Sequence, residues 1–293
     1  MSINEVENFC DSLRKYHTVK EITDRTEREL KYLNGACGST SSLRRYLTTY
    51  RKYLKEKINS KKLVEKTPLL VLLLSILILN KKQQGEMRTE HIDEVIEGQW
   101  GMRKIYDAEK YIEVSIGLLS AVSVYDRIIG LCALTGRRAA EIGTSAILTA
   151  VAGNNRLATF EGQLKMKDRK DQKTYEIPLL HDFKILNDVL LSIRKEKPGF
   201  IGKPLLFNNT ASSKISVKVK KHYSGILEGE IQAKNLRSIY ALLSYKLESK
   251  KYKNDETPFS MNAYFSEILG HGDDDVITSC SYVDFYLPNL LNL

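Results

Sequence analysis

Apolar residues recur at three- and four-residue spacing along most of this chain, which predicts a mainly helical protein. The first half reads as one helix after another. In residues 41–62, for example, Leu43, Leu47, Tyr50 and Leu54 fall on one face of a helix. We therefore expect this helix to bury that face within a small helical domain.

An apolar run at residues 68–79 departs from this spacing, because nearly all of its twelve side chains are apolar. A helix that spans a membrane needs about 20 such residues. The run therefore predicts a buried helix, with Pro68 in its first turn and the polar residues 80–82 closing it. The polar segment 82–101 then partly loses its periodicity, and we place an interdomain linker there.

The second half continues as helices, interrupted once by a pattern typical of β-strands. Residues 157–160 and 174–178 are strand-like and flank a charged middle, which predicts a β-hairpin with a basic tip. The predicted fold class is therefore mainly α with one small antiparallel β-sheet. Further helices are expected at residues 106–121, 125–134, 181–195, 213–228, 234–248, 259–269 and 275–288.

The net charge of +9 favours a polyanionic partner, nucleic acid above all. Residues 41–62 supply most of it, because they hold eight Lys/Arg against one acid. We expect this helix, with Ser41 as its N-cap, to contact DNA phosphates; the alternative is a solvated basic face. The candidate contact residues are Arg44, Arg45, Arg51, Lys52 and Lys55.

The four cysteines are scattered and form neither a zinc-binding pair nor a disulfide framework. We expect them to be reduced thiols in the cytosol. The polar, acidic N-terminus does not resemble a signal peptide. The expected location is thus the cytoplasm, in association with nucleoid, phage or plasmid DNA and without a membrane.

Three separated motifs carry the residue types that break a DNA phosphodiester. They are Thr-Gly-Arg-Arg-Ala-Ala-Glu at residues 135–141, Asn-Leu-Arg-Ser-Ile-Tyr-Ala at 235–241, and Leu-Gly-His followed by Thr-Ser-Cys-Ser-Tyr within 269–282. One such match arises easily by chance, whereas two arginines, a histidine and a late tyrosine in this order do not.

A phosphodiester is a poor electrophile, because its negative charge repels nucleophiles. Arginine neutralises that charge best, since its planar fork donates two parallel hydrogen bonds to phosphate oxygens. Arg138 and Arg237 are the candidates for this role. Glu141 could orient Arg138 from three residues away, although such a pair can also be a surface ion pair. Arg137 is the competitor, as an exposed neighbour.

The candidate nucleophile is the hydroxyl of Tyr282, with Tyr286 as a rival on the same predicted helix. A free tyrosine has a pKa near 10, so attack at neutral pH requires nearby cations or a proton acceptor. A phosphotyrosine ester would store the energy of the broken bond. Rejoining would then need no ATP, and the chain has no Walker-type phosphate loop.

The leaving 5′ oxygen needs a proton, and a lysine on the hairpin could supply it. Lys165 is the first choice and Lys167 the second, while Arg169 and Lys170 are expected to bind the DNA backbone. His271 would hydrogen-bond the phosphate, unless it is a structural histidine. The acidic run 273–275 is better explained as a helix N-terminus than as a cation site. No metal and no cofactor are expected.

These motifs resemble those of the tyrosine recombinases and, in their finer pattern, the telomere resolvases or protelomerases. The doubled arginine, the stretch Phe-Glu-Gly-Gln-Leu-Lys at residues 160–165 and the eleven-residue step from His271 to Tyr282 resemble that branch. Ordinary integrases usually have a histidine three residues before the second arginine. Here Lys234 takes that position, which the resolvases also vary.

The resemblance implies a clamp on DNA, with an N-terminal helical DNA-binding domain at residues 1–95 and a tyrosine-recombinase-like catalytic domain at 96–293. It also implies DNA cleavage and rejoining through a 3′-phosphotyrosine, and covalently closed hairpin ends on a linear replicon. The expected partner is double-stranded DNA with an inverted-repeat site, bound by a dimer. A site-specific integrase, a type IB topoisomerase and a non-catalytic DNA-binding protein are the alternatives.

Overall fold

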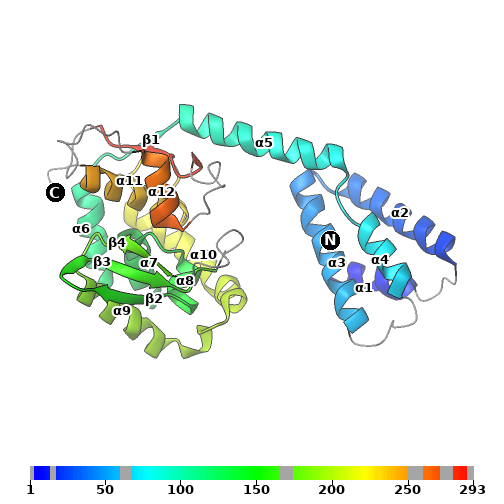
Figure 1. The fold of residues 1–293 in the computed structure, drawn as a ribbon, viewed down its shortest axis with the longest axis horizontal. Helices are drawn as coiled ribbons and strands as arrows, with labels where there is room; N and C mark the ends of the chain where they lie inside the picture. Colours follow the sequence, from blue (N-terminus) through cyan, green and yellow to red (C-terminus); the bar gives the residue numbers. More distant parts are fainter. Residues whose placement is uncertain are drawn as a thin grey trace. The chain divides into compact units, whose positions relative to one another are not determined.

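The computed structural model of the chain describes residues 3–13, 18–59, 67–164, 174–249, 260–270 and 280–288. The chain divides into two compact units, Met1–Asp93 and Glu94–Leu293 (Figure 1). Each unit has its own buried hydrophobic cluster. None of the helices in the described part of the chain is long and apolar enough to cross a membrane.

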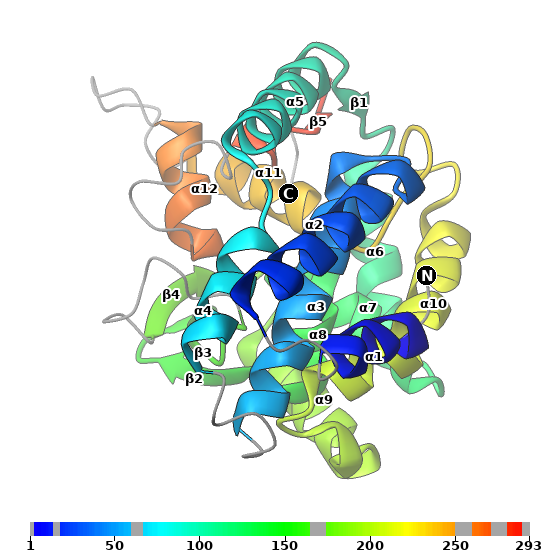
Figure 2. The ribbon, with the colours of Figure 1, turned by 90° about the vertical axis from the view of Figure 1, so that its right-hand side faces the viewer.

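In the first unit, helix α3 contacts the helices α1, α2 and α4 (Figure 2). The predicted apolar face of α3 is buried, since Leu43, Leu47, Tyr50 and Leu54 are at most 3% exposed. The hydroxyl of Tyr50 donates a hydrogen bond of 2.6 Å to the carboxylate of Glu29 on α2. The helices are α1 (Ile3–Ser12), α2 (Val19–Ala36), α3 (Thr40–Asn59) and α4 (Thr67–Ile76).

The basic helix begins earlier than its sequence suggested. Ser41 lies inside α3, and Ser39 provides the cap, because its Oγ accepts a hydrogen bond of 3.2 Å from the backbone N–H of Ser42. Four of the predicted DNA-contact residues are exposed, while Arg51 is only partly exposed. The cations on the exposed face of α3 are therefore Arg44, Arg45, Lys52 and Lys55.

The apolar run forms α4, which ends at Ile76, and a new helix follows where a linker was expected. Asn80 and Gln83 form a reciprocal cap: Asn80 Oδ1 accepts the Gln83 N–H at 2.8 Å, and Gln83 Oε1 accepts the Asn80 N–H at 3.1 Å. Helix α5 (Lys81–Trp100) is rich in good helix formers, so it needs no apolar stripe to be helical. The boundary between the two units falls within it.

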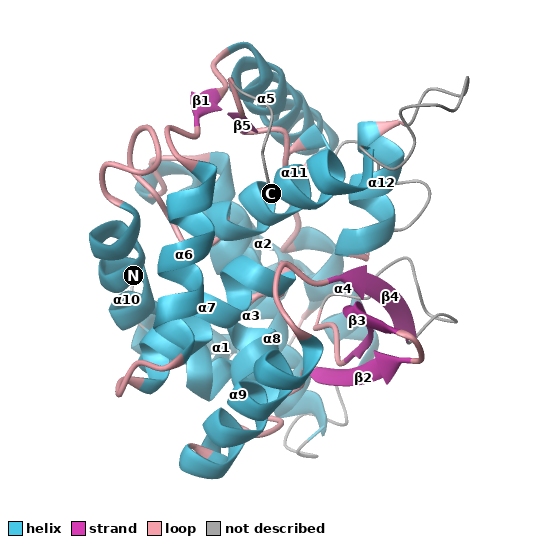
Figure 3. Cartoon of the chain, turned by 90° about the vertical axis from the view of Figure 1, so that its left-hand side faces the viewer, coloured by secondary structure: helices cyan, strands magenta, loops and turns pink. Residues whose placement is uncertain are grey.

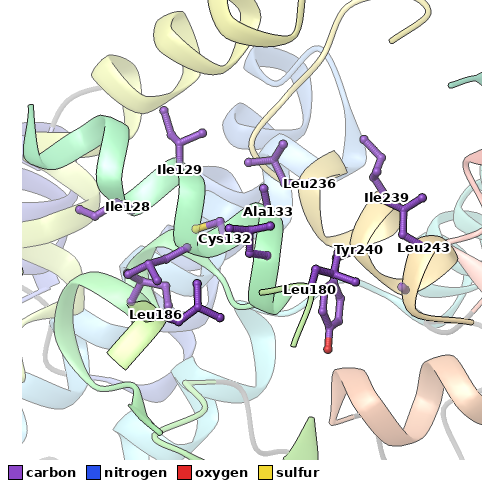
Figure 4. Close-up of a cluster of buried hydrophobic side chains, with 14 of the residues drawn as sticks. Ile128, Ile129, Cys132, Ala133, Leu180, Leu186, Leu236, Ile239, Tyr240 and Leu243 are labelled. Atoms are coloured by element: carbon purple, nitrogen blue, oxygen red, sulfur yellow. The ribbon is translucent and has the colours of Figure 1, made fainter. Parts of the chain in front are cut away.

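The core of the second unit is built around α7, which is buried along almost its whole length. Helices α6, α9, α10 and α11 all pack against it. Figure 4 shows Ile128, Ile129, Cys132 and Ala133 of α7 among side chains of α9 and α11. The helices are α6 (Ala108–Leu119), α7 (Val124–Thr135), α8 (Ala139–Thr144), α9 (Phe183–Glu196), α10 (Pro204–Tyr223), α11 (Asn235–Ser249) and α12 (Met261–Leu269), with a 3-10 turn at Pro198–Phe200.

The predicted strand pair is present as part of a three-stranded antiparallel sheet (Figure 3). Strand β3 (Asn154–Glu161) pairs with β4 (Thr174–Pro178) and, on its other edge, with β2 (Ile147–Val151). Helix α9 packs on β3 and α12 on β4. Strand β2 was not predicted, because five residues without strict alternation become a strand only through pairing with β3.

The last predicted helix, residues 275–288, is wrong from residue 281 onward, because the described chain is helical only at Cys280. Phe285–Tyr286 form strand β5, which pairs in parallel with β1 (Arg103–Lys104). Phe285 is only 3% exposed and belongs to the core of the second unit. Burial of this ring and the hydrogen bonds offered by β1 favour a strand over a helix here. Tyr286 therefore does not share a helix with Tyr282.

The exposed cations of α3 generate a test of its role in DNA binding. Replacing Arg44, Arg45, Lys52 and Lys55 with glutamine should weaken binding to every duplex sequence. The slope of log affinity against log salt should flatten by about 0.9 for each phosphate that the variant no longer neutralises. Fluorescence anisotropy at several salt concentrations would measure this slope.

A matched control keeps the net charge of this variant but alters other exposed lysines of the same unit. In this control, glutamine replaces four exposed lysines, Lys20, Lys31, Lys81 and Lys82. The slope of log affinity against log salt should change much less than in the α3 variant. Equal slopes for the two variants would indicate that the basic face of α3 is only solvated and does not contact DNA phosphates.

Candidate active site

The turn that leads into the first arginine motif depends on a glycine. Helix α7 ends at Thr135, and Gly136 follows in the left-handed conformation, with φ of 67°. A Cβ atom on Gly136 would lie 2.1 Å from the ring of Tyr240, so a side chain is excluded. This sharp turn gives the two consecutive arginines that follow it entirely different surroundings.

Arg138 occupies the N-cap position of α8 and is held by Glu141, as the spacing of the two residues predicted. Its backbone N–H lies 2.9 Å from Glu141 Oε2, and its Nη1 lies 2.6 Å from Oε1. The Glu141 side chain is fully buried, whereas that of Arg138 is 24% exposed. Burial disfavours the ionised form of Glu141, but the guanidiniums around it outweigh burial and lower its pKa. The pair is therefore no surface ion pair, and Arg138 is an oriented cation that reaches solvent.

Arg137 is not the exposed competitor that the sequence suggested, because it is only 1% exposed. Its Nε donates to Thr135 O at 3.1 Å, and its Nη2 donates to Ile268 O at 2.6 Å. Its Nη1 donates to the hydroxyl of Tyr175, and its guanidinium lies 4.8 Å from the ring centroid of Phe160. Arg137 thus ties the end of α7 to the sheet and to α12.

Arg237 reaches the same region from the third residue of α11 and is 4% exposed. Its Nη1 donates to Gly136 O at 2.6 Å, and its Nη2 donates to Leu269 O. Burial and the charges of Arg137 and Arg138 lower the pKa of Arg237 to about 10, so it is a cation at neutral pH. Its carbonyl partners come from the α7 turn and from the end of α12.

Tyr282 brings the third element to these cations. Its phenol lies beside both Arg237 and Arg138, and the Arg237 guanidinium lies 5.5 Å from the centroid of its ring. Burial by itself would raise the pKa of the phenol, but the two guanidiniums outweigh it and bring the pKa below the ordinary 10.0. The structure therefore places this tyrosine next to the cations that favour its phenolate.

A polar network joins the end of β3 to the end of α12. Gln163 Nε2 donates to Gly270 O at 2.7 Å, and Tyr175 donates to Gln163 Oε1 at 2.7 Å. Gly270 has a φ of 70°, and a Cβ there would lie 2.2 Å from Gln163 Oε1. Neither Tyr175 nor Gln163 was predicted from the sequence as a residue of the site. Tyr175 had a usable signal, since it alternates with Ile177 on the inner face of a strand, whereas Gln163 had none.

Part of the predicted site lies in two segments that the structure does not describe. One begins two residues after Gln163, and the other begins directly after Gly270. The predicted residues that lie outside the described part of the chain are Lys165, Lys167, Arg169, Lys170 and His271.

Lys234 is described, and it does not join the group around Tyr282. Its carbonyl accepts the Arg237 N–H at 3.2 Å, which is a contact of the first turn of α11. Its exposed side chain lines a surface pocket with Lys220 and Glu230, among others, and neither Arg237 nor Tyr282 lines that pocket.

The fold is similar to that of solved protelomerase structures. The sequence identities to these structures are low, so the similarity concerns the fold alone. An arginine-to-alanine variant of protelomerase TelA with a DNA hairpin product gives a TM-score of 0.81 at 22% identity, over 97% of this chain and 87% of that chain. TelA covalently complexed with substrate DNA gives 0.79 at 21%, with the same coverage of both chains. Protelomerase TelK with substrate DNA gives 0.63 at 18%, over 99% of this chain and 59% of that chain.

The family model of the telomere resolvase ResT/TelK catalytic domain matches residues 102–285, which is more than half of the chain. The chain therefore belongs to the telomere resolvase family. It is a DNA cleaving and rejoining enzyme of that family, and the family and fold class predicted from its sequence are confirmed. A comparison with curated proteins gave no match.

The different surroundings of the two consecutive arginines generate a matched pair of variants. Arg137→Lys should lower the free energy of unfolding by about 1–3 kcal/mol, because lysine cannot reach all the buried acceptors. Arg138→Lys should change stability little but slow DNA cleavage by about a hundredfold, the scale of losing one oriented donor. Thermal unfolding and single-turnover cleavage would measure both. The reverse pattern would exchange the roles of the two residues.

Proposed function

We propose that the chain cleaves DNA by attack of the Tyr282 hydroxyl on a phosphodiester, and that it joins the resulting ends as hairpins. One observation carries this proposal: the phenol of Tyr282 lies beside two arginines from separate elements, Arg138 and Arg237, whose charges lower its pKa. The same guanidinium forks suit the non-bridging oxygens of a phosphate. Nucleophile and phosphate would therefore meet at one cluster of cations.

In the cleavage step, the Tyr282 oxygen forms a bond to phosphorus, and the bond from phosphorus to the 5′ oxygen breaks. The strand then ends in a 3′-phosphotyrosine and a free 5′ hydroxyl. Arg138 and Arg237 stabilise the additional charge of the transition state, and His271 donates a further hydrogen bond. Lys165 supplies the proton that the leaving 5′ oxygen takes up. Glu141 keeps Arg138 oriented throughout.

In the joining step, a 5′ hydroxyl attacks the phosphotyrosine and releases Tyr282. When that hydroxyl belongs to the opposite strand, the product is a hairpin. Family membership supports this outcome, and so do the solved structures of TelA with a hairpin product and in a covalent complex with substrate DNA. An integrase or a type IB topoisomerase would share the phosphotyrosine and differ in this second step.

The two units of the chain suit a division of labour. Residues 1–95 would bind the duplex through the exposed cations of α3, and residues 96–293 would hold the chemistry. Closing both ends of one inverted-repeat site requires two active sites, so we expect two protomers on each duplex. The proposed steps use only side chains of the protein and the DNA.

The nucleophile can be tested directly. Tyr282→Phe should bind DNA normally and form no covalent complex, because it lacks only the attacking oxygen. Tyr286→Phe is the matched control and should cleave like the unmodified protein. Mass spectrometry of the adduct trapped on a nicked suicide substrate should locate DNA on Tyr282. An adduct on any other residue would overturn the assignment.

The product tests hairpin formation independently of the nucleophile. A single linear duplex with the inverted-repeat site should give two products that renature at once after heat or alkali, because each is one continuous strand. Opening the central base pairs for this costs a few kcal/mol per step. Denaturing gels would reveal the snap-back ends. Exchanged flanks or relaxed supercoils without such ends would indicate an integrase or a topoisomerase.

A further inference from the structure

The chain just beyond Tyr282 is attached to the body of the second unit by its backbone. The Arg103 N–H donates to Asp284 O at 2.9 Å, and the Ile105 N–H donates to Tyr286 O at 3.0 Å. The Phe285 ring is buried, and the Arg103 guanidinium lies 4.3 Å from its centroid. Tyr282 therefore lies three residues before the anchored strand β5.

The side chain of Asp284 adds a second attachment, to the helix that carries Arg237. Its Oδ2 accepts hydrogen bonds of 3.3 Å from Asn235 Nδ2 and 3.3 Å from Ser238 Oγ, and it lies 3.7 Å from Arg103 Nη2. Asn235 and Ser238 are 1% and 2% exposed. Both belong to the first turn of α11, where the helix dipole favours a carboxylate.

The amide of Asn235 is oriented for this contact. Its Oδ1 accepts the backbone N–H of Gln232 at 2.9 Å, so its Nδ2 is turned toward Asp284. Arg237 lies between Asn235 and Ser238 in the sequence, and its guanidinium lies 5.5 Å from the ring centroid of Tyr282. The Tyr282 segment is thus connected to the first turn of α11 in two ways, through the carboxylate of Asp284 and through the side chain of Arg237.

We propose that Asp284 is a positioning residue, which anchors the Tyr282 segment on Asn235 and Ser238 and thereby holds the phenol oxygen against Arg237 and Arg138. The exact position of the phenol oxygen matters for the cleavage rate, because a displacement of about 1 Å at a reacting group can cost about a hundredfold in rate. Asp284 acts through Tyr282, and its carboxylate is occupied by Asn235, Ser238 and Arg103. The inference rests on the proposed role of Tyr282 as nucleophile.

This role has a signature in the pH dependence of cleavage. The charged groups of the described residues that face the Tyr282 hydroxyl are Arg138 and Arg237, with Glu141 behind them. Without the anchor, the phenol would move away from these cations and its pKa would return toward about 10. Raising the pH would then restore the phenolate that the guanidiniums no longer favour.

The experiment compares variants by single-turnover formation of the covalent complex between pH 6 and pH 10. Asp284→Ala should be slower than the unmodified protein by about a hundredfold at pH 7, and this ratio should shrink at least several-fold near pH 10. Asp284→Asn should recover most of the rate, because its amide oxygen can accept the same bonds from Asn235 and Ser238. DNA affinity should be unchanged in both.

The matched control is Glu228→Ala. Glu228 Oε2 accepts the Lys104 N–H at 2.6 Å, so it supports the same strand β1 without touching the Tyr282 segment or α11. This variant should cleave at the normal rate at every pH. Ser238→Ala, which removes one anchor bond from the other side, should show the Asp284→Ala pattern more weakly and serves if Asp284→Ala does not fold.

Two outcomes would overturn the positioning role. One is normal cleavage by Asp284→Ala at pH 7; the other is a defect of equal size at all pH values, which indicates general loss of structure. Failure of the underlying nucleophile assignment looks different. In that case Tyr282→Phe would still form the adduct, whereas a failed anchor leaves Tyr282→Phe inactive and Asp284→Ala normal.

Discussion

Three guanidinium groups gather around one buried carboxylate, and the second unit is organised to make this arrangement stable. Arg137, Arg138 and Arg237 lower the pKa of Glu141. Burial and the charges of Arg137 and Arg138 in turn lower the pKa of Arg237. Mutual repulsion would separate these cations if only Glu141 opposed it. Backbone carbonyls offset the remaining repulsion between the cations, since Arg137 and Arg237 donate hydrogen bonds to the ends of both α7 and α12.

This requirement explains why the site is assembled from chain ends and turns. Carbonyls at helix C-termini lack partners within the helix, so they are the acceptors that buried arginines can use. Gly136 and Gly270 end α7 and α12 in the left-handed conformation, and each leaves no room for a side chain. The turn at Gly136 also leads into Arg138. Binding of the buried arginines and the direction of the chain at Arg138 are therefore one structural feature.

The arrangement also links the tyrosine to its environment. The cluster has more positive than negative groups, which suits it to an anionic ligand, and the Tyr282 oxygen already lies within reach of two of its donors. The elements that hold Tyr282 are the strand pair β1–β5 and the first turn of α11. Tyr282 and Arg237 thus share a common support in α11, which carries Arg237 between the two residues that bind Asp284.

The sequence by itself determined the features that depend on local pattern. Apolar spacing located the buried face of α3, alternation located β3 and β4, and the order of Arg138, Arg237 and Tyr282 indicated the family. It named Arg138 as the candidate but wrongly predicted that Arg137 is exposed, because the surroundings of two adjacent arginines are set by the turn at Gly136. It misjudged residues 285–286, since a strand of two residues exists only through its partner β1. Asp284 had no signal at all, because its hydrogen-bond partners lie 46 or more residues away in the chain and meet it only in the folded structure.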